Sequence, residues 1–205
     1  MKITPPTVYI IDDEPAIRDS LTLMITQENI PVMAFESAQA FLEGCPPDCS
    51  GCAIVDYRMP NMDGIELQAE LAKRDISIPI IFLTGHGNIP TSVKAMKAGA
   101  VDFLTKPVRR EKLISVVNLA IMESEKLREE NASYKEAVKC IESLTEREYD
   151  VMLLAIQGHH NKDIARKLGI SHRTVEIHKS NIMHKTGANH VLDLARIAHK
   201  SGLKE

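Results

Sequence analysis

The sequence predicts an α/β domain built on a doubly wound, five-stranded parallel sheet, followed by a small all-α domain. In the first 120 residues, short apolar runs alternate with amphipathic segments, whereas residues beyond 144 show only short helical patterns. The apolar runs are too continuous to leave one face of a sheet in water, which favours parallel strands covered on both sides. A chain of 205 residues is long enough for two small domains.

The polar residues that end the predicted strands indicate where a site should lie. Asp12 and Asp13 close the first apolar run, Asp56 ends the third, Thr84 ends the fourth, and Lys106 follows the fifth. Ligands of a doubly wound sheet collect at the carboxyl ends of its strands, so we expect these five side chains to converge on one edge. The strands are expected at residues 8–12, 31–35, 51–56, 79–84 and 101–105.

These residue types suit phosphoryl transfer to a carboxylate. Three crowded carboxylates repel one another unless a cation lies between them, and an oxygen cage with one open side suits Mg²⁺. Asp56 ends the central strand and is the best candidate nucleophile toward phosphorus. Lys106 would supply positive charge to the phosphoryl oxygens, and the Thr84 hydroxyl could donate a hydrogen bond to them.

Four motifs in this half resemble the signatures of the response-regulator receiver family. They are IIDDE, VDYRMPNMDG, TGHGNIPTSVKAMKAGAVDF and LTKP, within residues 7–122, and GHGNIP resembles the FixJ type in particular. The resemblance implies strand order 2-1-3-4-5 and phosphotransfer from a sensor histidine kinase to Asp56. It also implies a magnesium ion held by Asp12, Asp13, Asp56 and the backbone carbonyl of Arg58. Taken singly, Asp and Thr also commonly cap helices.

Phe103 occupies the position of an aromatic residue that, in this family, pairs with the threonine in a conformational switch. It could swing into the space that Thr84 vacates when the threonine moves toward a phosphoryl group. An equally good interpretation makes Phe103 an ordinary core residue. Both interpretations stay open at the level of sequence.

Charge and cysteine content limit the remaining function classes. The net charge is −6 over residues 1–143 and +3 over residues 144–205, and seven of the eight histidines lie in the second part, so that part suits a polyanion. No apolar run approaches a membrane span and the start lacks a signal peptide, which predicts a cytoplasmic protein. Cys45, Cys49 and Cys52 lack a fourth zinc ligand nearby, so they are interpreted as free thiols and a core residue.

Residues 123–143 are expected to form a linker helix that continues the last receiver helix. Alternating spacings of four and three produce a heptad seam from Leu113 to Ile141, weakened by Ser124 and Asn131. A parallel coiled coil and a single helix with a solvated charged face are both compatible with this pattern. The weak positions favour a phosphorylation-dependent homodimer over a permanent one.

Residues 144–205 are expected to form a helical DNA-binding domain. Thr145 and Glu148 provide a capping box, and a glycine between the second and third helices is typical of a helix-turn-helix. The sequence from LTEREYD to HKTGA resembles the LuxR-type output domain of FixJ/NarL regulators over residues 144–201. The expected helices are Glu146–Gln157, Lys162–Leu168, His172 to about Lys185, and His190–Ser201.

The third of these helices has one face suited to the core and one suited to DNA. Val175, His178 and Ile182 form the core stripe, with Lys179 at its edge. Ile177 could contact a thymine methyl group, and Glu176 could accept a hydrogen bond from cytosine. The rest of the predicted DNA-binding set is Ser180, Asn181 and His184 on the same face, with Arg173, Thr174 and Lys185 on phosphates. His159 and His160 are interpreted as loop residues in preference to metal ligands.

Taken together, these features predict a phosphorylation-controlled transcription factor with a receiver domain at 1–122 and an output domain at 144–205. An enzyme is disfavoured, because about sixty helical residues offer no nucleophile elbow or metal-ligand set, so only self-directed phosphotransfer and autodephosphorylation are expected. An adaptor that has lost DNA binding is disfavoured by the basic charge. The expected partners are a sensor kinase and promoter DNA, with RNA polymerase as a further candidate.

Overall fold

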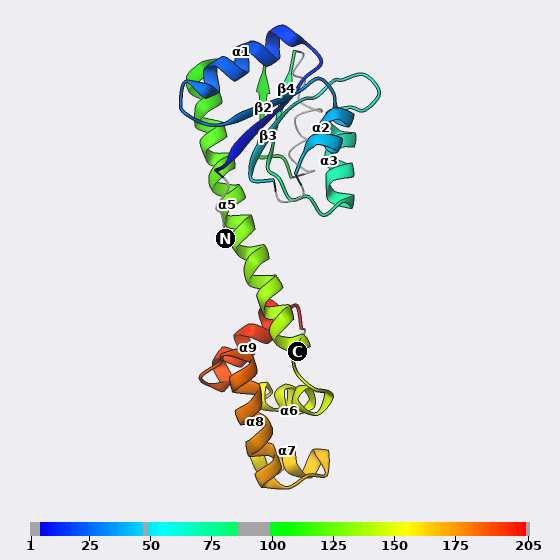
Figure 1. The fold of residues 1–205 in the computed structure, drawn as a ribbon, viewed down its shortest axis with the longest axis vertical. Helices are drawn as coiled ribbons and strands as arrows, with labels where there is room; N and C mark the ends of the chain where they lie inside the picture. The colour runs from blue at the N-terminus through cyan, green and yellow to red at the C-terminus, as the bar shows by residue number, and fades with distance from the viewer. Residues whose placement is uncertain (1–4, 47–48, 86–98, 204–205) are drawn as a thin grey trace. The chain divides into compact units, whose positions relative to one another are not determined.

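A computed structural model describes residues 5–46, 49–85 and 99–203 (Figure 1). The chain divides into two compact units, Met1–Arg128 and Glu129–Glu205. The first is an α/β unit and the second is helical, as predicted. No helix in the described ranges is both long enough and apolar enough to cross a membrane.

The first unit, Met1–Arg128, is called the receiver unit here because it contains the predicted receiver domain. It is built on a parallel sheet with strand order β2-β1-β3-β4-β5, which confirms the predicted order. Each strand begins and ends within one residue of the segment expected from the sequence. The strands are β1 (Thr7–Ile11), β2 (Val32–Phe35), β3 (Gly51–Asp56), β4 (Ile80–Thr84) and β5 (Asp102–Thr105). Because all strands run in the same direction, Ile11, Asp56 and Thr84 end at one edge.

Helices cover both faces of this sheet, and the strand side chains alternate between two cores. Tyr9 and Ile11 of β1 pack with α2 (Ala38–Gly44) and α3 (Gly64–Lys73). Val8 and Ile10 pack on the opposite face with α1 (Pro15–Thr26) and α5 (Arg110–Glu142). Figure 1 shows α1 and α5 on one side of the strands, and α2 and α3 on the other. The segment between the fourth and fifth strands, which contains most of the motif TGHGNIPTSVKAMKAGAVDF, falls largely on residues 86–98, outside the described ranges.

The first residues of the predicted heptad seam on α5 pack inside the receiver unit. Leu113, Val117 and Ala120 are fully buried against the sheet, so this part of the stripe is not available to a second helix. Ser124 is also buried, and its Oγ accepts a hydrogen bond from the Gly51 amide at 3.1 Å. The coiled-coil interpretation is therefore wrong for this part of the seam, because the same periodicity serves a helix that packs on a sheet.

The helical unit contains α6 (Glu146–Ile156), α7 (Asn161–Leu168), α8 (His172–Thr186) and α9 (Val191–Lys200), each within one residue of its expected bounds. Gly169 ends α7 with φ 67°, a left-handed conformation that favours glycine, and so allows the turn into α8. The Thr145–Glu148 capping box forms as predicted. The shared core includes Val151, Met152, Ile164, Val175, Ile182 and Leu194.

Candidate functional site

Three aspartates meet at the carboxyl edge of the receiver sheet. Asp12 and Asp13 follow β1 and Asp56 ends β3, and one carboxylate oxygen from each lies within 4.8 Å of the others. Asp12 and Asp56 are buried, whereas Asp13 is exposed. The structure therefore brings together the three side chains that the sequence predicts, with one side open to solvent.

Lys106 pairs with two of these aspartates and with Glu14. Its Nζ lies 2.7 Å from Asp12 Oδ2, 2.9 Å from Asp56 Oδ2 and 3.3 Å from Glu14 Oε1. The Lys106 amide donates to the Thr84 carbonyl at 2.7 Å, which fixes the backbone of the lysine at the end of β5. The fourth and fifth strands thus place one ammonium group beside two buried carboxylates.

The pKa shifts of these groups follow from burial and charge. Burial raises the pKa of Asp12, and the hydrogen bond and charge of Lys106 oppose that rise only in part. Burial alone would lower the pKa of Lys106, but its hydrogen bonds to Asp12 and Asp56 and their charges outweigh this effect and raise it. The lysine therefore stays charged near neutral pH, where it can interact with anionic oxygens.

The same carboxylates fit a magnesium ion. Asp12 Oδ2 is buried and, apart from its ion pair with Lys106, has no hydrogen-bond partner among the described residues. Oxygen ligands on one side of an exposed edge suit a hard cation that keeps several waters. Among the described residues, this is the one group of three or more His, Cys, Asp or Glu side chains close enough to share a metal. The Arg58 amide donates to Asp56 Oδ1 at 3.2 Å, and the Arg58 carbonyl stays a predicted ligand.

Thr84 and Phe103 occupy neighbouring strands, as the switch hypothesis requires. Thr84 is buried at the end of β4, whereas Phe103 is half-buried in β5. The Phe103 ring packs edge-on against Tyr57, with ring centroids 6.0 Å apart. This packing is compatible with both the switch and the core interpretation, so the switch stays a prediction.

Two residues at this edge were not expected from the sequence. Glu14 shares Lys106 with Asp12, and the Arg18 guanidinium donates to the Asp12 carbonyl at 2.7 Å. Both follow from the course of the chain, since α1 begins directly after the aspartates. The sequence signal that could have revealed Arg18 is its position as a charged residue one turn into α1.

The exposed face of α8 contains the residues predicted to contact DNA. Ile177 is 50% exposed, and Ser180, Asn181 and His184 are exposed beside it. Glu176 lies 3.6 Å from Arg173 in a surface ion pair, and 3.7 Å from His172 Nδ1. Thr174 is partly buried, and its amide donates to Ser171, the N-cap of α8. An isoleucine among polar residues still indicates an apolar partner.

Lys185 differs from the prediction that it contacts DNA phosphate. Its Nζ lies 2.7 Å from Oε2 of Glu148, which is buried, and donates to the Ser143 carbonyl at 3.2 Å. The hydrogen bonds from Lys185 and from the Thr145 amide lower the pKa of Glu148 to about 2. The lysine thus compensates a buried carboxylate inside the helical unit, which gives it a structural role that the wheel pattern did not indicate.

The inner stripe of α8 is largely as predicted. Val175 and Ile182 are fully buried. His178 is half-buried, and its Nδ1 has no hydrogen-bond partner in the described part of the chain. Lys179, at the edge of the stripe, donates to Asn161 Oδ1 at 2.7 Å, and burial lowers its pKa.

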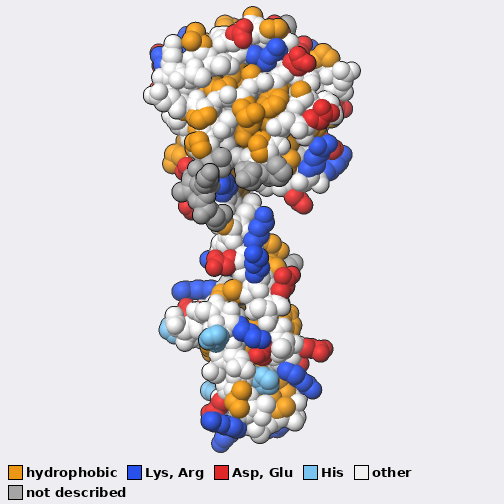
Figure 2. Space-filling view, viewed as in Figure 1, with side chains coloured by type: hydrophobic (Ala, Val, Ile, Leu, Met, Phe, Trp, Pro, Cys, Tyr) orange, Lys and Arg blue, Asp and Glu red, His pale blue; other side chains and the backbone are white. Residues whose placement is uncertain are grey.

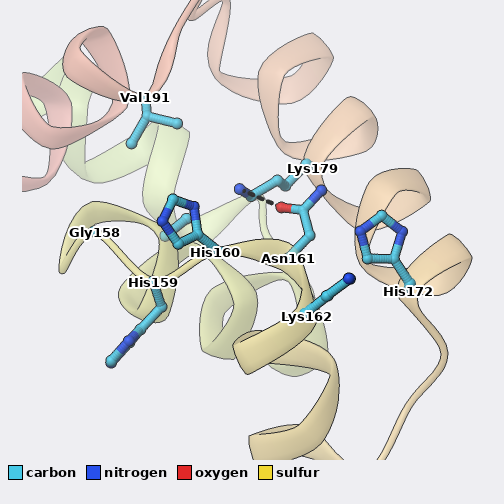
Figure 3. A pocket seen from close by; sticks show the side chains of 9 residues that line it. Gly158, His159, His160, Asn161, Lys162, His172, Lys179 and Val191 are labelled. Carbon is cyan, nitrogen blue, oxygen red and sulfur yellow. Dashed lines mark hydrogen bonds between the residues drawn. The ribbon is translucent and has the colours of Figure 1, made fainter.

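A pocket of about 530 Å³ lies between the start of α7 and α8 (Figure 3). Lys162, Lys179, His160 and His172 line it, so its walls suit an anion. The His159 side chain points away from the other two rings in Figure 3, and its Nε2 lies 2.7 Å from Lys167 Nζ. On the face that Figure 2 displays, histidine side chains are visible on the helical unit.

Two family profiles match the chain. Residues 8–118 match the response regulator receiver domain, and residues 142–198 match the bacterial regulatory proteins of the luxR family. Together these matches cover most of both units.

Relatives match the chain over nearly its whole length. It is 40% identical over 196 residues to the transcriptional regulatory protein FixJ of Bradyrhizobium diazoefficiens, covering 96% of each chain. It is 39% identical to the response regulator protein TodT of Pseudomonas putida, covering 94% of this chain and 85% of the relative. Among solved structures, the response regulator StyR matches with a TM-score of 0.85 and 38% identity over 96% of this chain and all of that one. Full-length FixJ from B. japonicum matches with a TM-score of 0.59 and 40% identity, over 98% and 100%.

The Glu148–Lys185 pair predicts acid sensitivity of the helical unit. Because the folded pKa of Glu148 lies below its ordinary value of 4.5, its contribution is complete above pH 4.5 and is lost as pH falls toward about 2. Urea unfolding of the full chain, followed through amide signals of the helical unit, should show Glu148→Gln destabilised at pH 7 by on the order of 1–3 kcal/mol. The difference from wild type should shrink below pH 4. Glu142→Gln, at an exposed position, is the control, and an equal loss in both variants would contradict the assignment.

Proposed function

Because the chain belongs to the transcriptional response regulators that join a receiver domain to a LuxR-type DNA-binding domain, we propose that phosphorylation of Asp56 controls its binding to promoter DNA. The family implies a sensor kinase as partner. The observation that supports Asp56 as the acceptor is its position between two further carboxylates and the Lys106 ammonium. We place the reaction in the bacterial cytoplasm, where a regulator of chromosomal genes acts.

The residues of the edge have separate roles in this proposal. A carboxylate oxygen of Asp56 attacks phosphorus, the P–N bond of a phosphohistidine breaks, and the leaving imidazole takes up a proton. Lys106 stabilises the charge on the phosphoryl oxygens, and the Thr84 hydroxyl donates a hydrogen bond to one of them. Asp12, Asp13, Asp56 and the Arg58 carbonyl would hold Mg²⁺, which supplies charge neutralisation when bound. Activity beyond this self-directed transfer and autodephosphorylation is not expected.

The helical unit would read DNA through α8. Ile177 is the residue that best supports this assignment, because its exposure within a polar face suits a thymine methyl group in the major groove. Arg173 and the basic pocket at the start of α7 would contact phosphates. Glu176, Ser180, Asn181 and His184 would contribute base or backbone contacts, whereas Lys185 would contribute only through its link to Glu148.

Dimerisation would connect phosphorylation to DNA affinity. In this proposal the phosphoryl group draws Thr84 inward and Phe103 follows, which changes the surface formed by β5 and the fourth receiver helix. That helix lies outside the described residues. Pairing of two receivers would raise the effective concentration of the second DNA-binding unit at a two-half-site operator, and contact with RNA polymerase would follow once the dimer is bound.

The phosphoacceptor assignment is tested with acetyl phosphate. Wild-type protein should be labelled only with Mg²⁺ present, and Asp56→Ala should not be labelled, because the nucleophile is missing. Asp19→Ala, which removes an exposed carboxylate from α1, is the control and should be labelled like wild type. Lys106→Ala should still accept the group but lose the increase in DNA affinity. Undiminished labelling of Asp56→Ala would contradict the assignment.

The DNA-contact assignment is tested by comparing base and phosphate contacts. Ile177→Ala and Glu176→Ala should change which bases are preferred, at a cost on the order of 1–3 kcal/mol per specific contact. Arg173→Ala should weaken all sites alike and reduce the salt-dependence slope by roughly one unit. Leu192→Ala removes an exposed leucine on α9 and should leave base preference unchanged. A uniform loss in every α8 variant would show that the readout face is misassigned.

The dimer hypothesis is tested by sedimentation of the full-length protein with and without beryllofluoride, which mimics the phosphoryl group. We expect a monomer that becomes a dimer, because the mimic should favour the receiver surface that docks a second copy. Phe103→Ala should reduce the shift if the aromatic ring transmits the change. An unchanged mass combined with higher DNA affinity would rule out the dimer and favour release of inhibition.

A further inference from the structure

The cysteine cluster is not used by the proposed function. Cys45 directly follows α2, Cys49 lies four residues further, and Cys52 is in β3. Cys52 is fully buried, whereas Cys45 and Cys49 are half-buried and both pack against the core on the α2 and α3 face. Two of the four thiols are thus near one another and partly accessible.

Hydrogen bonds of the described backbone place both cysteines close to the end of α2. The Cys45 amide donates to the Phe41 carbonyl at 2.8 Å, as the last bond of α2, and the Cys49 amide donates to the Pro46 carbonyl at 3.1 Å. The Cys45 thiol lies 3.6 Å from the Pro46 carbonyl and within hydrogen-bonding reach of the Cys49 side chain. Both cysteines also lie close enough to the Tyr9 hydroxyl to affect its ionisation.

We propose that Cys45 and Cys49 are a modification site at which a peroxide forms a reversible intramolecular disulfide. The Cys49 thiolate attacks one peroxide oxygen, the O–O bond breaks, and the released hydroxide takes up a proton to become water. The Cys45 thiol then loses its proton and attacks the Cys49 sulfenic acid, whose hydroxyl leaves as a second water. Two thiols are oxidised and one hydrogen peroxide is reduced to two waters.

The contact between the thiols sets the order of these steps. The hydrogen bond to Cys49, burial and the negative charge of Cys49 all raise the pKa of Cys45, so the Cys45 thiol keeps its proton near neutral pH and is assigned the second step. Burial and the charges of the two cysteines raise the pKa of Tyr9 to about 12, so its phenol keeps its proton near neutral pH. For Cys52, burial raises the pKa to about 12.

The pair also lies beside the contacts that attach α5 to the sheet. Ser50 Oγ accepts from Arg128 at 2.6 Å, and the Gly51 amide donates to Ser124 at 3.1 Å. Gly51 has φ 113°, and a Cβ there would lie 2.0 Å from the Thr7 carbonyl oxygen, so this segment has little freedom to adjust. A disulfide brings the sulfurs to about 2.05 Å, and the resulting movement should weaken the Gly51–Ser124 bond. This site lies at the amino end of β3, whereas Asp56 lies at its carboxyl end.

The test treats the reduced full-length protein with hydrogen peroxide and then blocks the remaining thiols with an alkylating reagent. In the wild type, two of the four free thiols should be lost, and the intact mass before alkylation should fall by the mass of two hydrogens. Peptide mapping should show Cys45 linked to Cys49. Dithiothreitol should restore both thiols. Cys140→Ser, which removes a half-buried cysteine elsewhere, is the control and should oxidise at the wild-type rate.

Two variants separate this mechanism from general thiol oxidation. Cys45→Ser should form no disulfide and should leave a Cys49 sulfenic acid that a cyclic 1,3-diketone traps, whereas Cys49→Ser should react at least about tenfold more slowly. Amide exchange at Gly51 should become faster in the oxidised wild type. Oxidation confined to Cys52 or Cys140, links between chains, or retention of all four thiols would overturn the disulfide, and unchanged Gly51 exchange would overturn its effect on α5.

Discussion

The structure of the receiver unit depends on one constraint, which is that two buried carboxylates at a sheet edge need positive charge beside them. Lys106 supplies it, with its ammonium 2.7 Å from Asp12 and 2.9 Å from Asp56. This requires β5 to end beside β4 and the lysine backbone to be held by the Thr84 carbonyl. A phosphoryl group on Asp56 would add anionic oxygens next to a lysine that three carboxylates already share, so Lys106 would have to change partners. Under the proposed function, the lysine that stabilises this edge would therefore also be the group that responds to the phosphoryl group.

Much of the fold was predictable because the parallel sheet leaves a simple signal. Each strand is a continuous apolar run, and the polar residue after it marks the edge, as with Asp12 and Asp56. Periodicity did not predict whether α5 packs against a second helix or against the sheet. A stripe with spacings of four and three fits a second helix or a sheet, and only the structure shows Leu113 in the receiver core. Ser124 looked like a weak seam position, yet it is the acceptor for the Gly51 amide, and no local pattern reveals a hydrogen bond across 73 residues.

The same limit applies to the DNA-binding unit. The exposed isoleucine on α8 followed from the helical wheel, and Ile177 is indeed half-exposed. The role of Lys185 did not follow, because the wheel places a basic residue on a face without showing what lies across from it. The capping box predicted Glu148 at the start of α6, and the structure adds the lysine that its burial requires. The buried carboxylate of Glu148, which caps α6, thus pairs with the ammonium of Lys185, 37 residues away.

The helix α5 belongs to both units of the chain. Its first half is part of the receiver core, and beyond Arg128 it belongs to the helical unit, where Ala137 is again buried. Near the boundary it is held to the sheet by Ser124 and Arg128, which bond to the segment that begins β3. Asp56 ends that same strand, six residues after Ser50. The strand is buried along its whole length, and close packing leaves little room to absorb displacements. The two proposed modifications lie at opposite ends of this strand, and the thiol pair is the one that adjoins the hydrogen bonds holding α5.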